Sequence, residues 1–459
     1  MVFSSLLFIY FFLPLVIFLY YIVRDNYKNL VLAISSLIFI YLGDQKYFYI
    51  LIAIASLSFL YGIFYIKVES KKYRKIGLII SSLIIFSTLF FFKYFDFIAS
   101  SLNNITNSNI KLLNLALPLG ISFYIFQASS YIFDVYRETT KPEKSLINFF
   151  AYLAFFPQLI AGPIVQYVEI KDELHNKKYD IDKIVDGIYQ FVLGLGKKVL
   201  IANQLGLIIS SVSDDRLSIW LKSLAFTLQL YFDFSGYSDM AIGLGKIFGF
   251  TFPKNFNYPF ISKSVTEFWR RWHISLGRWF REYVYIPMGG NRVSKARWIL
   301  NILVVWFLTG LWHGASWNFV LWGLIMAFFL FIEKLFKNTL EKIPSFIRIL
   351  LTFLIINFSF VVFNYTDLNR SISDILVMIG VNGTNNISQI SRFVFFDNII
   401  LLITAFLLSA PIYPKLIERY IENTRYEYLI KLIITMIIII LSTAYLVNDS
   451  FNPFLYFRF

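Results

Sequence analysis

Residues 264–281 read Ser264-Val-Thr-Glu-Phe-Trp-Arg-Arg-Trp-His-Ile-Ser-Leu-Gly-Arg-Trp-Phe-Arg281, and residues 308–317 read Leu308-Thr-Gly-Leu-Trp-His-Gly-Ala-Ser-Trp317. The segment 251–323 around them holds eight of the nine tryptophans and two of the three histidines. Ser264, followed three residues later by Glu267, is a capping box, which predicts that a helix begins there. We expect the rest of the chain to be organised around this segment.

On a helical wheel at about 100° per residue, the segment 264–283 separates into two faces. The aromatic and apolar face consists of Phe268, Trp269, Trp272, Leu276, Trp279, Phe280 and Tyr283. The basic face consists of Arg270, Arg271, Arg278 and Arg281. Rings on one side and guanidinium groups on the other suit a helix that lies in the membrane interface. We therefore predict one interfacial helix, whose arginines either face lipid or bind an anionic donor such as coenzyme A.

The composition excludes an ordinary soluble domain. Of the 459 residues, 58% are hydrophobic and only 15% are charged, and the mean hydropathy is +0.65. The apolar runs are continuous rather than alternating, which favours membrane helices over a β-barrel. A net charge of +14 is explained by basic cytoplasmic loops and anionic lipid rather than by nucleic acid. The absence of cysteine excludes thiolate catalysis and a Cys-ligated metal.

Long apolar runs recur along the chain, and we predict an all-α membrane domain covering residues 1–459, with roughly ten to twelve transmembrane or re-entrant helices. Basic residues gather after alternate runs, which places the N-terminus outside the cell under the positive-inside rule. Within this one domain we distinguish N-terminal helices (1–144), a catalytic core (145–333) and C-terminal helices (334–459). The predicted spans are 3–23, 29–43, 47–66, 76–99, 113–133, 217–233, 298–312, 317–333, 348–364, 398–414 and 429–447.

Two regions break this pattern. Residues 145–168 are interrupted by Phe156-Pro-Gln-Leu-Ile-Ala-Gly-Pro163, which predicts a re-entrant or broken helix because such backbone needs protein or a cavity around it. The span 217–233 runs into Asp233-Phe-Ser-Gly-Tyr-Ser-Asp239. Carboxylates at the end of an apolar span are costly unless they are exposed or paired.

The histidines are the best candidates for catalysis. His313 follows an apolar run without charge from Ile299 onwards, and an ionisable side chain at such a place indicates function. The alternative is a histidine satisfied by a helix-end carbonyl. His273 among the tryptophans is a weaker candidate, and His175 in a charged loop is expected to be solvated. Three scattered histidines without a carboxylate cluster do not predict a metal site.

At these residues the chain resembles the membrane-bound O-acyltransferase family, in particular the bacterial branch of alginate and peptidoglycan O-acetyltransferase membrane subunits. The resemblance covers most of the chain and rests on six blocks in order. They are 117–127 with 131–136, Phe156–Pro163, Asp233–Asp239, Asn255-Phe-Asn-Tyr-Pro-Phe260, Phe268-Trp-Arg-Arg-Trp-His-Ile-Ser-Leu276 and Gly310-Leu-Trp-His-Gly314.

The resemblance implies helices around a central tunnel, with His313 as the catalytic histidine and His273 as the second histidine of this branch. His313 is then expected to act as general base toward an acceptor hydroxyl, and His273 to orient either the donor or its carbonyl. The arginine-rich helix is expected to bind the donor. Candidate residues for the tunnel lining are Trp269, Trp272, Trp312, Gly310, Gly314, Asp233 and Tyr237.

The resemblance also implies the partners. The donor is a cytoplasmic thioester, with acetyl-CoA as co-substrate and no resident cofactor. The acceptor is an extracytoplasmic polysaccharide such as peptidoglycan or an exopolysaccharide. A separate extracytoplasmic acetyltransferase protein completes the transfer to it. The chain itself is expected in the bacterial cytoplasmic membrane. Alternatives are D-alanyl transfer to teichoic acid from a carrier protein, or a polysaccharide or lipid transporter. A transporter is disfavoured because neither repeated halves nor several intramembrane charges are evident.

Overall fold

The computed structural model describes residues 2–160, 162–177, 179–212, 214–382, 387–421, 424–448 and 455. Within these ranges every regular element is a helix, and nine helices are long and apolar enough to cross a membrane. The protein is therefore an all-α, multi-pass membrane protein, as the sequence predicts. Its chain divides into two compact units, residues 1–191 with 240–253, and residues 192–239 with 254–459.

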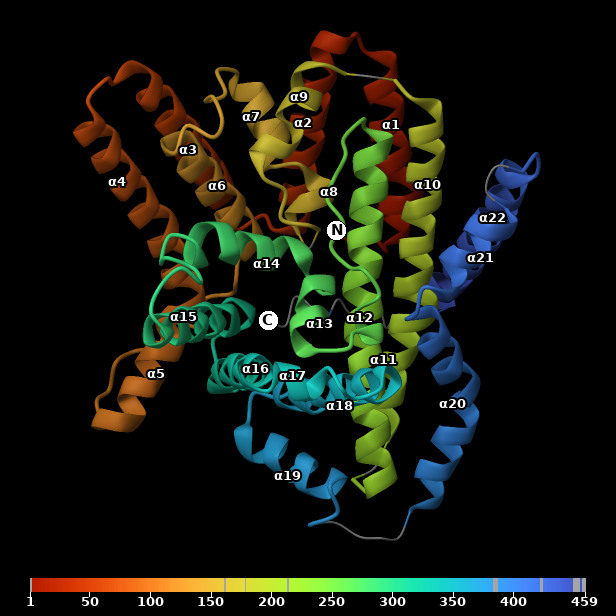
Figure 1. Cartoon of the computed structure of the whole chain (residues 1–459). Coiled ribbons are helices and arrows are strands. Elements are labelled where there is room, and N and C mark those ends of the chain that lie inside the picture. The colour runs from red at the N-terminus through yellow and green to blue at the C-terminus, as the bar shows by residue number, and fades with distance from the viewer. Residues whose placement is uncertain are drawn as a thin grey trace. The chain divides into compact units, whose positions relative to one another are not determined.

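The first unit is a helical assembly in which α3, α4 and α6 pack side by side (Figure 1). Phenylalanine rings fill part of its core, for example Phe8 and Phe39, whose ring centroids lie 5.7 Å apart. It also contains α10 (Ile181–Gly196) up to residue 191 and the last residues of α12 (Arg216–Ile247). The other helices are η1 (Phe8–Phe12), α1 (Leu13–Ile22), α2 (Asp25–Gly43), α3 (Phe48–Lys67), α4 (Lys71–Leu89), η2 (Phe90–Tyr94), α5 (Phe95–Thr106), α6 (Ile121–Tyr136), α7 (Leu146–Leu153), α8 (Phe156–Leu159) and α9 (Tyr167–His175).

Two predictions for this unit have different outcomes. The span predicted at 113–133 is wrong at its start, because α6 begins only at Ile121, after Gly120 with a positive φ of 70°. A Cβ at Gly120 would lie 2.6 Å from the carbonyl oxygen of Leu159, so the start of α6 approaches α8 too closely for any side chain. The predicted break in 145–168 is confirmed, since three short helices replace one span.

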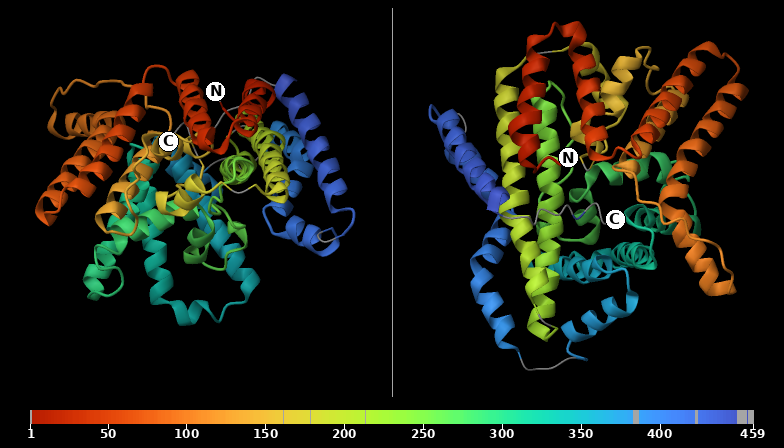
Figure 2. Two further views of the ribbon diagram at one scale, coloured as in Figure 1. Left: turned by 90° about the horizontal axis from the view of Figure 1, so that it is seen from above. Right: turned by 180° about the vertical axis from the view of Figure 1, so that it is seen from behind.

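The second unit contains the arginine-rich segment 264–281, which includes His273, and it also contains His313. In it α15, α16 and α18 run side by side, and the left view of Figure 2 shows these teal helices along their length. The elements are η3 (Lys197–Ala202), α11 (Asn203–Ser211), η4 (Pro259–Ile261), α13 (Val265–Arg271), α14 (Ile274–Phe280), η5 (Arg281–Tyr285), α15 (Lys295–His313), α16 (Trp317–Leu335), α17 (Lys337–Leu340), α18 (Ser345–Asn364), α19 (Leu368–Met378), α20 (Gln389–Leu408), α21 (Ile412–Tyr420) and α22 (Glu427–Asn448).

Helices α10 (Ile181–Gly196) and α12 (Arg216–Ile247) contribute to both units. The predicted span 217–233 is too short, because α12 continues through the polar stretch to Ile247. In the second unit a Cβ at Gly236 would lie 2.7 Å from the Gly194 carbonyl oxygen. Small residues permit this close backbone approach, as is common between membrane helices.

The polar stretch of α12 remains helical because its carboxylates are paired. The Lys198 ammonium lies 2.7 Å from Asp233, and both side chains are almost completely buried. The Lys197 ammonium lies 2.6 Å from Asp239, and these two side chains are about one quarter exposed. This confirms that carboxylates at this depth are tolerated when they have a cationic partner.

Candidate active site

The arginine-rich segment does not form the single helix that the wheel predicts. Helix α13 ends at Arg271 and α14 begins at Ile274, because His273 adopts the left-handed conformation with φ 45°. The segment before α13 stabilises this break, since the Ile274 N–H donates to the Asn255 carbonyl at 3.0 Å. The start of the helix is as predicted, with the Ser264 hydroxyl accepting from the Glu267 N–H at 3.0 Å.

The aromatic rings of this segment pack inside the protein, although the helical wheel predicts that they face the membrane interface. Phe268 and Trp272 are buried in the protein core, where they stack with centroids 5.4 Å apart and contact Phe360 of α18. Trp279 and Phe280 on α14 are also buried. The prediction that these rings enter the acyl boundary is wrong, because neighbouring helices supply enough apolar surface to cover them.

The break at His273 brings the two histidines together. His313 ends α15, and its ring centroid lies 6.5 Å from that of His273. Both rings are buried, with 5% and 2% of the respective residues exposed. Burial, and then the neighbouring His313, hold the pKa of His273 well below its usual value. His273 is therefore neutral near pH 7, with a lone pair on one of its ring nitrogens.

Aromatic rings surround this histidine pair. Trp322 of α16 and Phe363 of α18 contact His313 edge-on, with centroids 5.2 and 5.3 Å away. Trp312 lies 5.5 Å from His273. Aromatic walls exclude water, and the low dielectric strengthens the electrostatic interactions of the reacting groups. No sequence pattern predicts Trp322 and Phe363 as part of the site, because only tertiary packing places them beside His313.

Close packing of α15 and α16 positions His313. A Cβ at Gly310 would lie 2.3 Å from the Phe319 carbonyl oxygen, and one at Gly323 equally close to that of Trp306. At Gly310, a candidate for the tunnel lining, the space beside the helix is therefore occupied by the backbone of α16. Gly314 faces the ring of Phe319.

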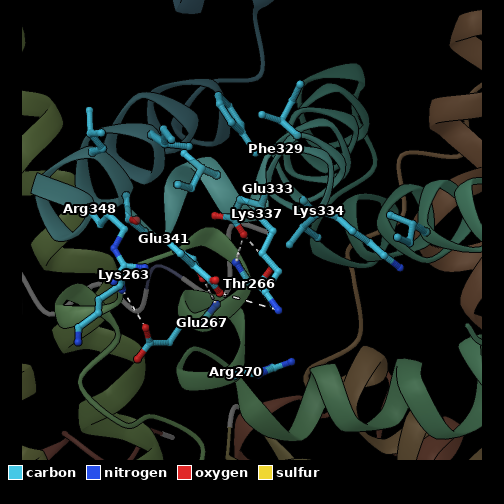
Figure 3. Close-up of a pocket in the computed structure, with 18 of the residues that line it drawn as sticks. Lys263, Thr266, Glu267, Arg270, Phe329, Glu333, Lys334, Lys337, Glu341 and Arg348 are labelled. Atoms are coloured by element: carbon cyan, nitrogen blue, oxygen red, sulfur yellow. Dashed lines mark hydrogen bonds and ion pairs between the residues drawn. The ribbon is translucent and has the colours of Figure 1, made fainter. Parts of the chain in front are cut away.

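A cavity of about 850 Å³ opens among α13, α15, α16, α17 and α18 (Figure 3). Its apolar lining includes Trp298, Ile302 and Trp306 of α15. Acidic residues also line it, and Glu333 accepts the backbone N–H of Thr266 at 2.9 Å and thereby caps α13. The basic lining residues are Lys263, Arg270, Lys334, Lys337 and Arg348.

Trp306 connects the lining of this cavity with the surroundings of His313. It lines the cavity and lies seven residues before His313, about 10 Å along the helix axis. Its ring packs against Trp269, with centroids 4.8 Å apart, and against Trp322 at 6.2 Å. Trp322 in turn contacts His313. The cavity and the histidine pair are thus separated by tryptophan rings.

The four arginines predicted to bind a donor occupy different environments. Arg270 is exposed and lines the cavity, whereas Arg271 pairs with Glu267 at 2.9 Å. Although burial opposes it, hydrogen bonds from the Lys263 backbone and from Arg271 hold the pKa of Glu267 below its usual value. Arg278 is half-buried on α14, and Arg281 is exposed at the start of η5.

The remaining candidates for the tunnel lining are buried in the second unit. Asp233 pairs with Lys198 and accepts the Leu455 N–H at 2.9 Å. The next residue, Phe234, contacts the His273 ring edge-on at 4.7 Å. Tyr237 is buried one turn further along α12. The Asp233 ion pair therefore holds the helix that supports His273.

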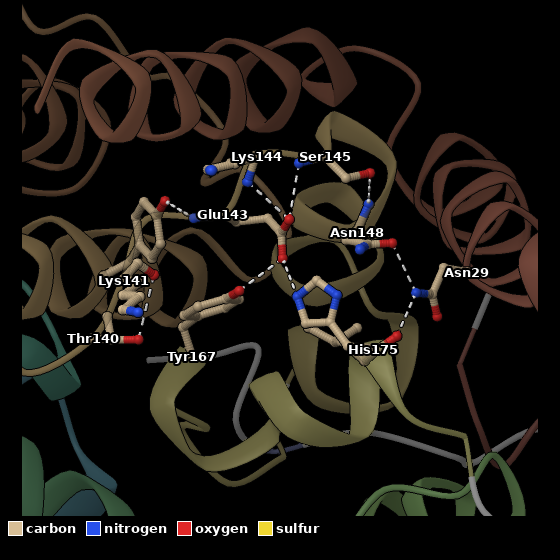
Figure 4. A network of polar contacts seen from close by, with 11 residues as sticks. Asn29, Thr140, Lys141, Glu143, Lys144, Ser145, Asn148, Tyr167 and His175 are labelled. Atoms are coloured by element: carbon tan, nitrogen blue, oxygen red, sulfur yellow. Dashed lines mark hydrogen bonds and ion pairs between the residues drawn. The ribbon is translucent and has the colours of Figure 1, made fainter. Parts of the chain in front are cut away.

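His175 belongs to the first unit. The sequence predicts a solvated side chain, but in the structure this histidine has a buried partner. Its Nε2 lies 2.9 Å from the buried carboxylate of Glu143, although the imidazole is half-exposed. The Tyr167 hydroxyl donates to the same carboxylate at 2.7 Å, and the N–H groups of Lys144 and Ser145 donate at 2.8 Å (Figure 4). This network ties α9 to the start of α7.

The fold and the site define a multi-pass helical membrane protein with two buried histidines beyond an amphipathic cavity. Residues 72–373, more than half of the chain, match the model of MBOAT, the membrane-bound O-acyltransferase family. The chain belongs to this family and is an O-acyltransferase. Both histidines lie in the matched region.

Its relatives include proteins with named activities. The probable alginate O-acetylase AlgI of Pseudomonas aeruginosa is 38% identical over 85% of this chain and 77% of its own length. The peptidoglycan O-acetyltransferase of Helicobacter pylori is 34% identical over 84% of this chain and 81% of its own length. The teichoic acid D-alanyltransferase of Bacillus subtilis is 30% identical over 55% of this chain and 69% of its own length.

Proposed function

We propose that this O-acyltransferase acetylates hydroxyl groups of an extracytoplasmic polysaccharide, such as peptidoglycan or an exopolysaccharide, with a cytoplasmic thioester as donor. The relatives named as O-acetylating enzymes support this acceptor class, because they match more than four fifths of the chain at 34–38% identity. The D-alanyltransferase matches a smaller share at lower identity. D-alanyl transfer to teichoic acid is therefore the second candidate.

The observation that carries the proposal is the buried histidine pair beyond a cavity whose lining holds five basic and three acidic residues. In the proposed reaction His313 accepts the proton of the acceptor hydroxyl while the oxygen attacks the thioester carbonyl. The tetrahedral intermediate collapses, the carbon–sulfur bond breaks, and the thiolate takes the proton from the imidazolium. General base catalysis contributes about 10²–10⁴-fold, and positioning two substrates in a dry site contributes much of the rest.

The cavity is proposed as the donor entrance. Its basic residues suit the phosphates of coenzyme A or of a phosphopantetheine-bearing carrier protein. Its apolar wall along α15 suits the uncharged arm that carries the thioester. Rearrangement of Trp306 and Trp269 would then admit the acyl group to His313.

The proposed topology puts this cavity at the cytoplasmic face. The basic segment from Lys334, at the end of α16, to Arg348, at the start of α18, contributes Lys334, Lys337 and Arg348 to the cavity. Such segments remain in the cytoplasm under the positive-inside rule. In this arrangement the N-terminus is extracytoplasmic, the membrane is the bacterial cytoplasmic membrane, and a separate extracytoplasmic acetyltransferase completes transfer to the polysaccharide.

The test measures base-labile acetate in purified cell wall and, separately, in secreted polysaccharide. Strains to compare are wild type, a deletion, and the deletion complemented with wild-type or His313→Ala protein at matched membrane levels. We expect acetate to be lost from one fraction and restored only by the wild-type protein. Unchanged acetate in both fractions would refute polysaccharide acetylation, and D-alanyl esters would be measured next.

The donor is tested with purified protein in vesicles. Radiolabelled acetyl-CoA and an acetylated carrier protein are supplied separately, and acetyl release or transfer is followed. A Lys334→Gln/Arg348→Gln double variant is expected to need more donor for half-maximal rate, while His313→Ala lowers the maximal rate. Equal donor dependence in the double variant and the wild type would exclude the cavity as the donor entrance.

A further inference from the structure

Asn255 makes a set of hydrogen bonds that determines which ring nitrogen of His273 carries the hydrogen. Its buried side-chain Oδ1 accepts the Ser275 backbone N–H at 3.2 Å and the Ser275 hydroxyl at 2.9 Å. Its Nδ2 donates to the Ser238 hydroxyl of α12 at 3.1 Å. The same Oδ1 lies 3.2 Å from Nδ1 of His273.

The backbone N–H of Ser275 decides which way the Asn255 amide points. An amide oxygen and nitrogen are hard to distinguish by shape, and their assignment rests on the hydrogen-bond network. A backbone N–H can only donate, so the atom that faces Ser275 must be the oxygen. Nδ1 of His273 faces this oxygen and must therefore carry a hydrogen. In a neutral imidazole the other nitrogen, Nε2, then holds the lone pair.

We propose that Asn255 is a positioning residue that holds His273 in the Nδ1–H tautomer, so that Nε2 acts as a hydrogen-bond acceptor in the acyl-transfer site. The tautomer follows from the geometry alone, whereas its use in transfer rests on the proposed function.

The tautomer distinguishes between the two roles expected for His273. A neutral ring with its lone pair on Nε2 has no hydrogen there to donate to a thioester carbonyl or to an oxyanion. It accepts instead, from a substrate hydroxyl or from an amide N–H of the donor arm. Of the two expected roles, donation to the reacting carbonyl is therefore excluded, and orientation of a substrate through Nε2 remains.

Asn255 also holds the unusual backbone of His273. A left-handed conformation is uncommon for a residue other than glycine. The Asn255 carbonyl accepts the Ile274 N–H, and its side chain binds Ser275, so both residues after the turn are attached to one asparagine. Loss of the side chain would leave the buried Ser275 N–H without this acceptor and would destabilise the turn at His273.

A direct test reads the tautomer without any activity. The chain contains only three histidines, so ¹⁵N-histidine protein in lipid nanodiscs gives few ring signals, which His175→Gln and His313→Gln variants assign. We expect the His273 signals of a protonated Nδ1 and an unprotonated Nε2 at pH 7. The opposite tautomer would overturn the proposal, even if acetyl transfer is confirmed.

A kinetic test uses Asn255→Asp, which keeps an oxygen for both Ser275 donors and adds a negative charge beside Nδ1. That charge stabilises the protonated ring, so the acid limb of the rate–pH profile is expected to move to higher pH. Asn257→Asp, at an exposed position two residues later, is the matched control and should leave the profile unchanged. Superimposable profiles for all three proteins would refute a role in transfer, whereas an inactive wild-type protein would refute the proposed function instead.

Discussion

Neutralising Asp233 tests how strongly the buried ion pair holds α12 beside the histidines. The Asp233→Asn variant keeps an oxygen for the Leu455 N–H but removes the charge that faces Lys198. At the observed 2.7 Å, the gross attraction of two unit charges is about 6 kcal/mol for an effective dielectric constant of 20. Part of it is offset by desolvation. Removing one partner of a buried pair is expected to lower the free energy of unfolding by about 3–5 kcal/mol, because the other charge remains buried.

The adjacent pair provides a matched control. Lys197 and Asp239 are 2.6 Å apart in the same two helical segments, but each side chain is about one quarter exposed. Because water screens this pair, Asp239→Asn should destabilise the protein by about 1 kcal/mol or less. The Lys198→Met/Asp233→Asn double variant removes both buried charges and should recover part of the stability lost in Asp233→Asn.

Unfolding is followed by intrinsic tryptophan fluorescence in detergent, because the chain has nine tryptophans and no cysteine for thiol-reactive dyes. Thermal and denaturant transitions of these three variants, and of the single Lys198→Met variant, are compared with those of the wild type. The reasoning would be refuted if Asp233→Asn were no less stable than Asp239→Asn. It would also fail if the double variant were as unstable as the sum of its single changes, since the two charges would then not interact.

Three further predictions concern the site. His313→Gln should lower the rate of acetyl transfer by about 10²–10⁴-fold without lowering the membrane level of the protein, and near wild-type turnover would exclude it as the base. Burial depresses the pKa of His273, so below about pH 6.5 the unfolded chain takes up a proton on this residue that the folded chain does not. The free energy of unfolding should therefore decline as the pH falls below about 6.5. This part of the pH dependence should disappear in the His273→Gln variant. Gly310→Ala should reduce both the amount of folded protein and its activity, because the added Cβ would lie 2.3 Å from a backbone oxygen. Gly277→Ala should be tolerated, because its Cβ would lie 4.0 Å from the nearest backbone oxygen.

Much of the membrane architecture could be predicted from sequence because apolar length is a local property. The predictions at 317–333 and 348–364 agree with α16 and α18 to within a few residues. The ends of other helices were missed where distant contacts set them. Helix α6 starts only where Gly120 passes the Leu159 carbonyl, and hydropathy carries no signal for such a contact.

In the candidate site, too, some residues could be predicted from local sequence and others could not. His313 and His273 were identifiable because each stands in an unusual local setting and in a block typical of the family. Their neighbours were not identifiable in this way. Trp322 and Phe363 come from the next two long helices, and Glu333 caps α13 from 67 residues away in the chain.

By itself the sequence determined the membrane class, the O-acyltransferase resemblance and the two histidines, since these depend on composition and on short motifs. Only the tertiary structure decided that the arginine-rich segment breaks at His273 and that the two histidines meet. The physical reason is that a regular helix satisfies its own backbone, so a break requires acceptors from elsewhere. Here Asn255, 18 residues before His273, supplies them, and no local pattern around the histidine reveals it.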